Sequence, residues 1–159
     1  MPRSTNQLLK YGFTKETEFM YALTKLIDNE DVVMKKMEDQ YDNVDFIITN
    51  KNNYTKLYIE LKSRTIDISK FNSFMIGRNK LYGISQKYKD DAVILVWIDT
   101  YHNLFYKLYD DELLNSEIKY SNGSDVFLIK KNECKNSNLQ HLANCILECH
   151  NQINQSLSS

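Results

Sequence analysis

The sequence has little proline or glycine and no long apolar run. Its only proline is Pro2, and it has four glycines in 159 residues, so long flexible linkers are not expected. The longest apolar run, residues 92–98, is far shorter than the roughly 18 residues of a membrane span. With 42% apolar residues the chain can build one core. We therefore expect a single domain over residues 1–159 and no membrane association.

The features of a secreted protein are also missing. Residues 1–7 contain no apolar segment of the kind that a secretory signal carries. The three cysteines are Cys134, Cys145 and Cys149, so one thiol would stay unpaired whichever two formed a disulfide. Free thiols are typical of a reducing compartment. We therefore expect an intracellular protein.

Basic residues are concentrated in one segment, although the net charge is −1. Residues 62–89 contain one acid, Asp67, and seven basic residues: Lys62, Arg64, Lys70, Arg78, Lys80, Lys87 and Lys89. This local excess predicts a phosphate-binding surface. A solvated basic loop and helix face is the alternative that composition leaves open.

Hydrophobic periodicity predicts an α/β fold. Thr14 suits the N-cap of a helix that runs to about Asp28. Helices are also predicted at 77–89 and 139–157, with a helical turn at 110–116. Strands are predicted at 32–37, 44–49, 54–63, 92–98, 104–109 and 126–131, and residues 65–76 are read as a loop. This order predicts a mixed sheet flanked by helices.

One predicted hairpin concentrates acidic and basic side chains on a single face. Residues 44–49 and 54–63 flank a short turn and should pair antiparallel. Because side chains alternate along a strand, Glu60 and Lys62 point away from Leu61. Asp45 is out of phase with Phe46 and reaches the same face. A surface ion pair on an amphipathic strand would show the same pattern.

Two carboxylates at this position suit a hard cation such as Mg²⁺, which takes oxygen ligands. The carbonyl of Leu61 could supply another oxygen. A lysine two residues from a ligand could orient an attacking water or neutralise charge on a phosphate. Asp45, Glu60 and Lys62 are therefore candidate catalytic residues.

These segments resemble those of the PD-(D/E)xK nuclease superfamily, and in motif most closely the archaeal-type Holliday-junction resolvases. The resemblance is carried by residues 45–48 (Asp-Phe-Ile-Ile) and 58–64 (Tyr-Ile-Glu-Leu-Lys-Ser-Arg). Val44 stands where the superfamily often has proline. The predicted order of elements over about residues 11–98 agrees with the restriction-endonuclease-like core, and residues 99–157 would be additions to it.

The first helix adds a further acid to this comparison. Residues 12–16 (Gly-Phe-Thr-Lys-Glu) are similar to the Gly-x-x-x-Glu with which that helix often begins in the family. The resemblance implies that Glu16 is catalytic and completes a Mg²⁺ or Mn²⁺ site with Asp45, Glu60 and the Leu61 carbonyl. Glu18 stays an alternative, because only the fold decides which acid faces the hairpin.

The resemblance implies a Mg²⁺/Mn²⁺-dependent deoxyribonuclease that hydrolyses DNA phosphodiester bonds, with branched or junction DNA as a candidate substrate. It implies a homodimer, located in the cytoplasm, in the nucleus or at a site of DNA replication. The residues expected to contact DNA are Arg64, Lys70, Arg78, Lys80 and Lys87. Two alternatives stay open: a catalytically inactive nuclease-fold protein serving as a nucleic-acid-binding or assembly module, and a protein–protein interaction domain.

A zinc site is the other metal site that the sequence offers. His141, Cys145 and Cys149 recur every four residues on the last predicted helix, and these residue types bind zinc. Ligands at these positions of one straight helix spread too far for a single tetrahedral ion. We therefore interpret the cysteines as small buried thiols beside the apolar face of that helix.

Overall fold

The structure is a computed structural model. It describes residues 5–39 and 41–158, with side chains described for residues 15–39 and 41–150. The helices are α1 (Thr5–Ile27), α2 (Arg78–Lys87) and α3 (Leu139–Ser158). The strands are β1 (Val32–Lys36), β2 (Phe46–Asn50), β3 (Lys56–Arg64), β4 (Ser73–Gly77), β5 (Ala92–Asp99), β6 (Leu104–Leu108), β7 (Glu117–Ser121), β8 (Ser124–Lys130) and β9 (Lys135–Ser137). Short 3₁₀ turns lie at η1 (Ile68–Lys70), η2 (Asp111–Asn115) and η3 (Lys131–Glu133).

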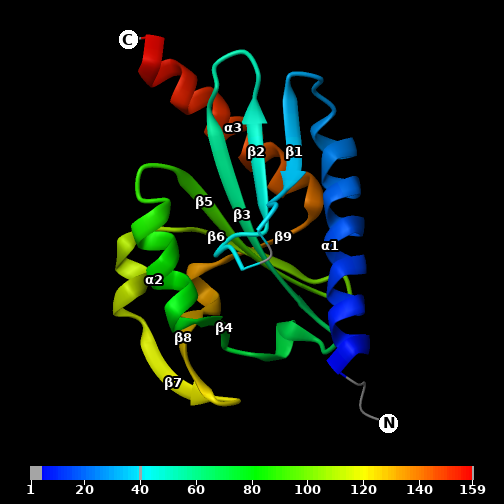
Figure 1. The fold of residues 1–159 in the computed structure, drawn as a ribbon, viewed down its shortest axis with the longest axis vertical. Coiled ribbons are helices and arrows are strands. Elements are labelled where there is room, and N and C mark those ends of the chain that lie inside the picture. Colours follow the sequence, from blue (N-terminus) through cyan, green and yellow to red (C-terminus); the bar gives the residue numbers. More distant parts are fainter. Residues whose placement is uncertain (1–4, 40, 159) are drawn as a thin grey trace.

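A six-stranded mixed sheet forms the centre of the molecule (Figure 1). Its strand order is β1-β2-β3-β5-β6-β9, and β3 and β5 are parallel while the other neighbours are antiparallel. The parallel pair requires a crossover connection, which here contains η1, β4 and α2. A second sheet of three strands has the order β4-β8-β7.

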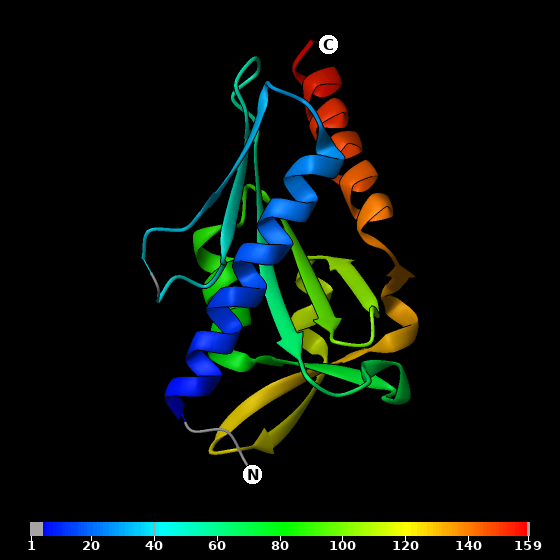
Figure 2. The ribbon, with the colours of Figure 1, turned by 90° about the vertical axis from the view of Figure 1, so that its right-hand side faces the viewer.

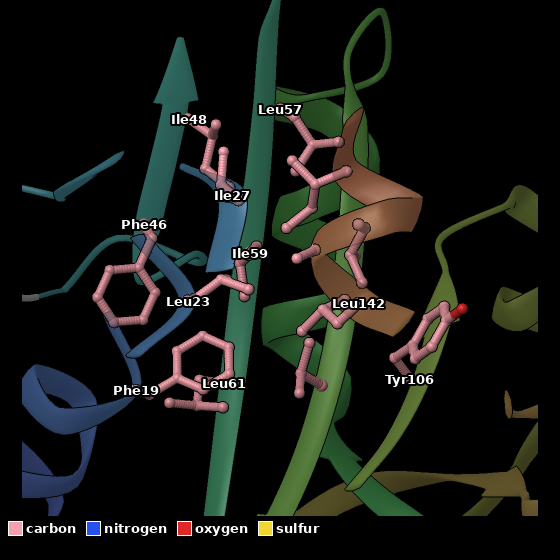
Figure 3. Packing of buried hydrophobic residues seen from close by; sticks show 14 of the residues in the cluster. Phe19, Leu23, Ile27, Phe46, Ile48, Leu57, Ile59, Leu61, Tyr106 and Leu142 are labelled. Atoms are coloured by element: carbon pink, nitrogen blue, oxygen red, sulfur yellow. The ribbon is translucent and has the colours of Figure 1, made fainter. Parts of the chain in front are cut away.

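One face of the large sheet packs against α1 and α3, which lie side by side (Figure 2). The buried layer between them is apolar. Phe19 and Leu23 of α1 meet Phe46 of β2 and Ile59 of β3, with Leu142 of α3 beside them (Figure 3). These side chains are at most 4% exposed, so this layer contributes much of the burial that stabilises the fold.

The opposite face is covered by α2 and by the three-stranded sheet. Tyr58 and Trp97 of the large sheet pack here against Ile84 of α2 and against Phe74 and Phe127 of the small sheet. Each of these side chains is at most 7% exposed. The fold is therefore a layered α/β structure in which a helix and a second sheet share one face.

The predicted α/β class, mixed sheet and flanking helices are confirmed. The predicted hairpin is also confirmed, since Phe46 pairs with Ile59 in the antiparallel β2–β3 register. The predicted N-cap at Thr14 is wrong, because α1 begins at Thr5. A single internal glycine, Gly12, costs helix stability but does not end a helix. No helix in the described part of the chain has an apolar stretch long enough to cross a membrane.

The sequence predicted a loop over residues 65–76, and this prediction is wrong. These residues contain η1 and most of β4, which pairs with β8 about fifty residues later. The strands β7 and β9 were also not predicted. The burial of β4 alternates, with Phe74 and Ile76 inside, but such a short strand becomes recognisable only through its distant partner.

Candidate functional site

Asp45 lies just before β2, against the edge of β3. Its backbone N–H donates to the carbonyl of Ile59 (2.8 Å), the register partner of Phe46, so Asp45 does not continue the β2–β3 register to Glu60. Its carboxylate accepts the backbone N–H of Leu61 (2.7 Å). The Asp45 carboxylate therefore accepts the hydrogen bond that a backbone carbonyl of a neighbouring strand would otherwise accept from Leu61. Because the N–H and C=O of a strand residue point to the same edge, the Leu61 carbonyl faces the Asp45 side of β3.

Glu60 is a carboxylate buried in the middle of β3. Its side chain is 1% exposed. One oxygen, Oε1, lies 2.9 Å from the ammonium of Lys80 and 3.4 Å from that of Lys62. The other oxygen, Oε2, is buried without a hydrogen-bond partner among the described residues. A buried charged oxygen without a partner is costly, and a bound cation would remove that cost.

The electrostatics show how closely these groups interact. Burial raises the pKa of the Glu60 carboxyl to about 7, and the negative charge of Asp45 contributes in the same direction, while Lys62 and Lys80 oppose the rise. The hydrogen bonds of Asp45 to the backbone of Ile59 and Leu61, on either side of Glu60, place the two acidic residues next to each other. Burial lowers the pKa of Lys62. Burial also acts to lower the pKa of Lys80, but the charge of Glu60 raises it overall.

The donor set fits a hard divalent cation that keeps part of its water shell. Two adjacent carboxylates and the Leu61 carbonyl are oxygen ligands of the kind that Mg²⁺ takes, and Glu60 Oε2 is available. Within the described side chains, no three acidic, histidine or cysteine residues converge closely enough to hold a metal ion. A cation here would therefore be held by two carboxylates, a carbonyl and water.

Glu16 and Glu18 take different positions on α1. The Glu16 carboxylate lies 2.8 Å from the ammonium of Lys36, at the end of β1. Lys36 pairs with Phe46, the residue that follows Asp45. Glu18 is 60% exposed and pairs with Lys15. The Glu16 carboxylate is thus at the end of β1, and neither acid joins a metal-holding group of described residues.

The five basic residues expected to contact DNA fall into two sets. Lys80, Arg78 and Lys87 form ion pairs with carboxylates of this chain, and Arg64 and Lys70 form the second set. Lys80, on the first turn of α2, forms an ion pair with Glu60 beside Lys62, whereas the sequence predicted a phosphate contact for it. Arg78 pairs with Asp125 (3.3 Å) and Lys87 pairs with Asp42. Arg64 follows at the end of β3, and Lys70 is exposed on η1. Three of the five residues expected to contact DNA therefore already neutralise carboxylates of this chain.

The segment before Asp45 is attached to α2, and sequence reasoning missed this contact. The carboxylate of Asp42 is 3% exposed and accepts hydrogen bonds from Lys87 and from the Tyr88 hydroxyl. Gly83 of α2 faces Asn43 so closely that a Cβ atom would overlap the asparagine side chain. The same helix therefore positions Lys80 and the segment that leads to Asp45.

The cysteines show no zinc site in the described part of the chain. Cys145 and Cys149 pack against the apolar layer under α3, and Cys134, Cys145 and Cys149 are free thiols. The half-buried thiols agree with the interpretation drawn from the sequence.

The candidate residues Asp45, Glu60 and Lys62 lie together in a layered α/β fold, and the comparison with known proteins gives the class of that fold. The family described as "Phage putative PDDEXK endonuclease" matches residues 11–120, and the chain belongs to that family. No curated protein sequence matches it. A solved structure of Archaeoglobus fulgidus Hjc, a Holliday junction resolvase, is similar with a TM-score of 0.46 and 11% identity, covering 80% of this chain and 98% of that one.

Proposed function

We propose that the chain is a Mg²⁺- or Mn²⁺-dependent endonuclease that hydrolyses DNA phosphodiester bonds. The observation that carries this proposal is Glu60, a buried carboxylate with one oxygen left without a partner, beside Asp45 and two lysines. Burying a charge costs free energy because the charge loses its hydration. Strongly shifted pKa values cluster at functional sites. A surface ion pair on an amphipathic strand would carry neither feature.

In this mechanism Asp45, Glu60 and the Leu61 carbonyl would hold the ion. The ion would polarise a phosphoryl oxygen and acidify a bound water. Lys62 shares the face of Glu60 and has a lowered pKa, so it is suited to orient the attacking water and to neutralise charge on the phosphate. Lys80 holds Glu60 Oε1 in place. Glu16 is the candidate for a third carboxylate ligand, reached by exchanging Lys36 for the ion.

DNA is the proposed substrate because of the basic residues around this site. Arg64, Lys70, Arg78, Lys80 and Lys87 are the proposed phosphate contacts. Arg64 and Lys70 would meet DNA directly. Arg78, Lys80 and Lys87 would have to leave their carboxylate partners to bind a phosphate. The lost ion pair reduces the net attraction that each of them can supply. A homodimer, which would bring two such sites to two strands, and branched or junction DNA as substrate are part of the same proposal.

Metal binding and cleavage test the proposal in turn. Adding Mn²⁺ should raise the midpoint of thermal unfolding, and Asp45→Ala should remove that shift, since ligands that bind only the folded state stabilise it. Asp125→Ala, which removes an exposed carboxylate elsewhere, should keep the shift. A panel of branched, single-stranded and duplex DNA with Mn²⁺ should then yield cleavage products with wild-type protein and none with Asp45→Ala.

Each outcome of these two measurements has a definite meaning. Loss of the Mn²⁺ shift in the Asp125 control would mean that the ion binds elsewhere. No shift in the wild type would refute the metal site. A shift without cleavage of any substrate would assign the chain to the catalytically inactive nuclease-fold proteins that serve as binding modules.

A further inference from the structure

A pocket of about 240 Å³ opens beyond the end of β3, on the sheet face that carries Glu60 and Lys62. Its apolar wall is formed by Ile66, Phe71, Phe74, Met75 and Trp97, and Arg64 and Lys119 also line it. This Trp97 pocket lies between the end of β3 and the three-stranded sheet. It is smaller than the roughly 300–1,000 Å³ of pockets for drug-sized ligands, so it suits one planar ring system.

The opening of the Trp97 pocket leaves apolar side chains in water. Ile66 is 53% exposed, Phe71 is 46% exposed and Met75 is 36% exposed. Below them, Trp97 and Phe74 are stacked with ring centroids 5.4 Å apart and an interplanar angle of 27°. Exposed apolar groups gathered around one concavity mark interaction sites. The Trp97 and Phe74 side chains are 2% and 4% exposed, so they form the floor of the pocket, and the exposed ring of Phe71 is the surface on which another ring can stack.

The charge at the pocket restricts the ligand further. Arg64 and Lys119 line it from β3 and from β7, and the wall between them is apolar. A ring attached to an anionic chain matches both features. Bases on a phosphate backbone have this chemistry, and proteins bind them with aromatic stacking and basic side chains together.

The Trp97 pocket is also placed within reach of the candidate site. Glu60, Lys62 and Arg64 are every second residue of β3 and therefore lie on one face of it. At about 3.3 Å per residue, the Cα atoms of Glu60 and Arg64 are separated by about 13 Å. A few nucleotides of one strand can span that distance. Lys62 pairs with Trp97 across the β3–β5 ladder, which connects the two locations directly.

The segment that forms the pocket mouth is held by side-chain hydrogen bonds. The Asp99 carboxylate accepts the backbone N–H of Ile68 (2.8 Å). The side-chain amide of Asn103 donates to both Asp99 and Asp67 (2.8 Å each). These contacts fix residues 67–69 against β5, so a ligand would meet a preformed pocket and would not pay for ordering it.

We propose that the Trp97 pocket binds an unpaired nucleobase of the DNA strand held at Asp45 and Glu60, with Arg64 and Lys119 on the adjoining phosphates. This inference rests on the proposed function and adds a substrate class to it. A base within a duplex is paired and stacked and enters a pocket only after unstacking. DNA with unpaired nucleotides near the cut is therefore preferred over continuous duplex.

Binding measured in Ca²⁺, where cleavage is suppressed, tests the preference. Wild-type protein should bind a flap or gapped DNA at least about tenfold more tightly than a fully paired duplex of equal length, as expected for stacking of one base. Phe71→Ala should weaken binding to the flap DNA about tenfold and to the duplex less than about twofold. Tyr120→Ala, an exposed aromatic on β7 that does not line the pocket, should change neither.

A fluorescent base locates the contact. With 2-aminopurine placed at successive unpaired positions, one position a few nucleotides from the cut should change its fluorescence on binding, and Phe71→Ala should abolish that change. Wild-type protein that binds and cleaves DNA without preferring unpaired nucleotides would refute the pocket assignment alone. Equal losses on both substrates in Phe71→Ala would do the same. A wild-type protein that neither binds nor cleaves DNA would refute the proposed function as well.

Discussion

The two faces of the large sheet differ in what they bury. Toward α1 and α3, the side chains of Leu57, Ile59 and Leu61 are at most 5% exposed and pack in an apolar cluster. On the other face of the same strand, Glu60 is equally buried but pairs with Lys62 and Lys80. Neighbouring residues of β3 therefore differ in kind, and the buried charge of Glu60 is the feature that the stability of the fold does not explain. The sheet side that carries Glu60 and Lys62 is called the charged face below.

This contrast separates stability from chemistry. Apolar burial on the α1–α3 side is favourable in itself. On the other side, burying the charges of Glu60, Lys62 and Lys80 costs free energy of folding. Such buried, shifted ionisable groups are typical of binding and catalytic sites. Substitutions on the two faces should consequently affect different measurements.

The largest effect is expected from Lys62→Ala on the charged face. Turnover on DNA with Mn²⁺ should fall about 1,000-fold, or about 4 kcal/mol in the activation barrier, because the proposed role of Lys62 is to act on the reacting phosphate. The dissociation constant measured in Ca²⁺ should stay within about twofold, since the contribution is made mainly in the transition state. Lys56→Ala, at the exposed start of the same strand, is the control and should change neither. A loss of binding as large as the loss of turnover would contradict the assigned role.

On the apolar face the same logic predicts a loss of stability without loss of turnover. Leu23 of α1 is fully buried against β2 and β3, while Leu26 on the same helix is 36% exposed. Leu23→Ala should lower the free energy of unfolding by about 3.5 kcal/mol through lost burial and a residual cavity. Leu26→Ala should cost less than about 1 kcal/mol. Urea unfolding measures both, and turnover per folded molecule should be unchanged. A selective loss of turnover in Leu23→Ala would remove the separation between the two faces.

Protonation of Glu60 gives a third, smaller effect. Its folded-state pKa of about 7 lies above the ordinary 4.5. Between these values the folded protein keeps a proton that the unfolded chain releases, so stability falls as pH rises. Relative to Glu60→Gln, metal-free wild-type protein should lose about 3 kcal/mol of unfolding free energy between pH 4.5 and 7. Above that window the difference should level off.

Urea unfolding in EDTA at several pH values measures this difference. Burial lowers the pKa of His150, so His150 contributes in the opposite direction, but equally in both proteins. Parallel curves for wild-type protein and Glu60→Gln would mean that Glu60 titrates normally.

The charged face was predictable from sequence only along β2 and β3. The two-residue period of a strand placed Glu60 and Lys62 together, and the short turn after β2 fixed a β2–β3 register that ends at Phe46, the residue after Asp45. Lys80 was not predictable as a partner of Glu60, because the position of α2 depends on β4, which pairs with β8 far along the chain. For the same reason Lys119 and Trp97 could not be connected from sequence alone.

The helix acids show the same limit. Helical spacing shows that Glu16 and Glu18 point in different directions, but not which direction the fold uses. That required the position of Lys36 on β1, which pairs with Glu16. Thr14 was misread for a local reason. Its residue type favours an N-cap, but nothing in the preceding segment stops the helix that begins at Thr5.

The smallest effect is expected where α2 meets the segment before Asp45. Alanine at position 83 would favour the helix by about 1 kcal/mol, but its Cβ atom would overlap the Asn43 side chain and displace it. The two effects should nearly cancel in stability. The displacement should shift Asp45, two residues further on, and weaken Mn²⁺ binding several-fold, as measured by titration calorimetry. The double variant Gly83→Ala/Asn43→Gly removes the overlapping side chain and should recover most of that affinity. If the double variant binds Mn²⁺ as weakly as Gly83→Ala, the contact between α2 and Asn43 does not position Asp45.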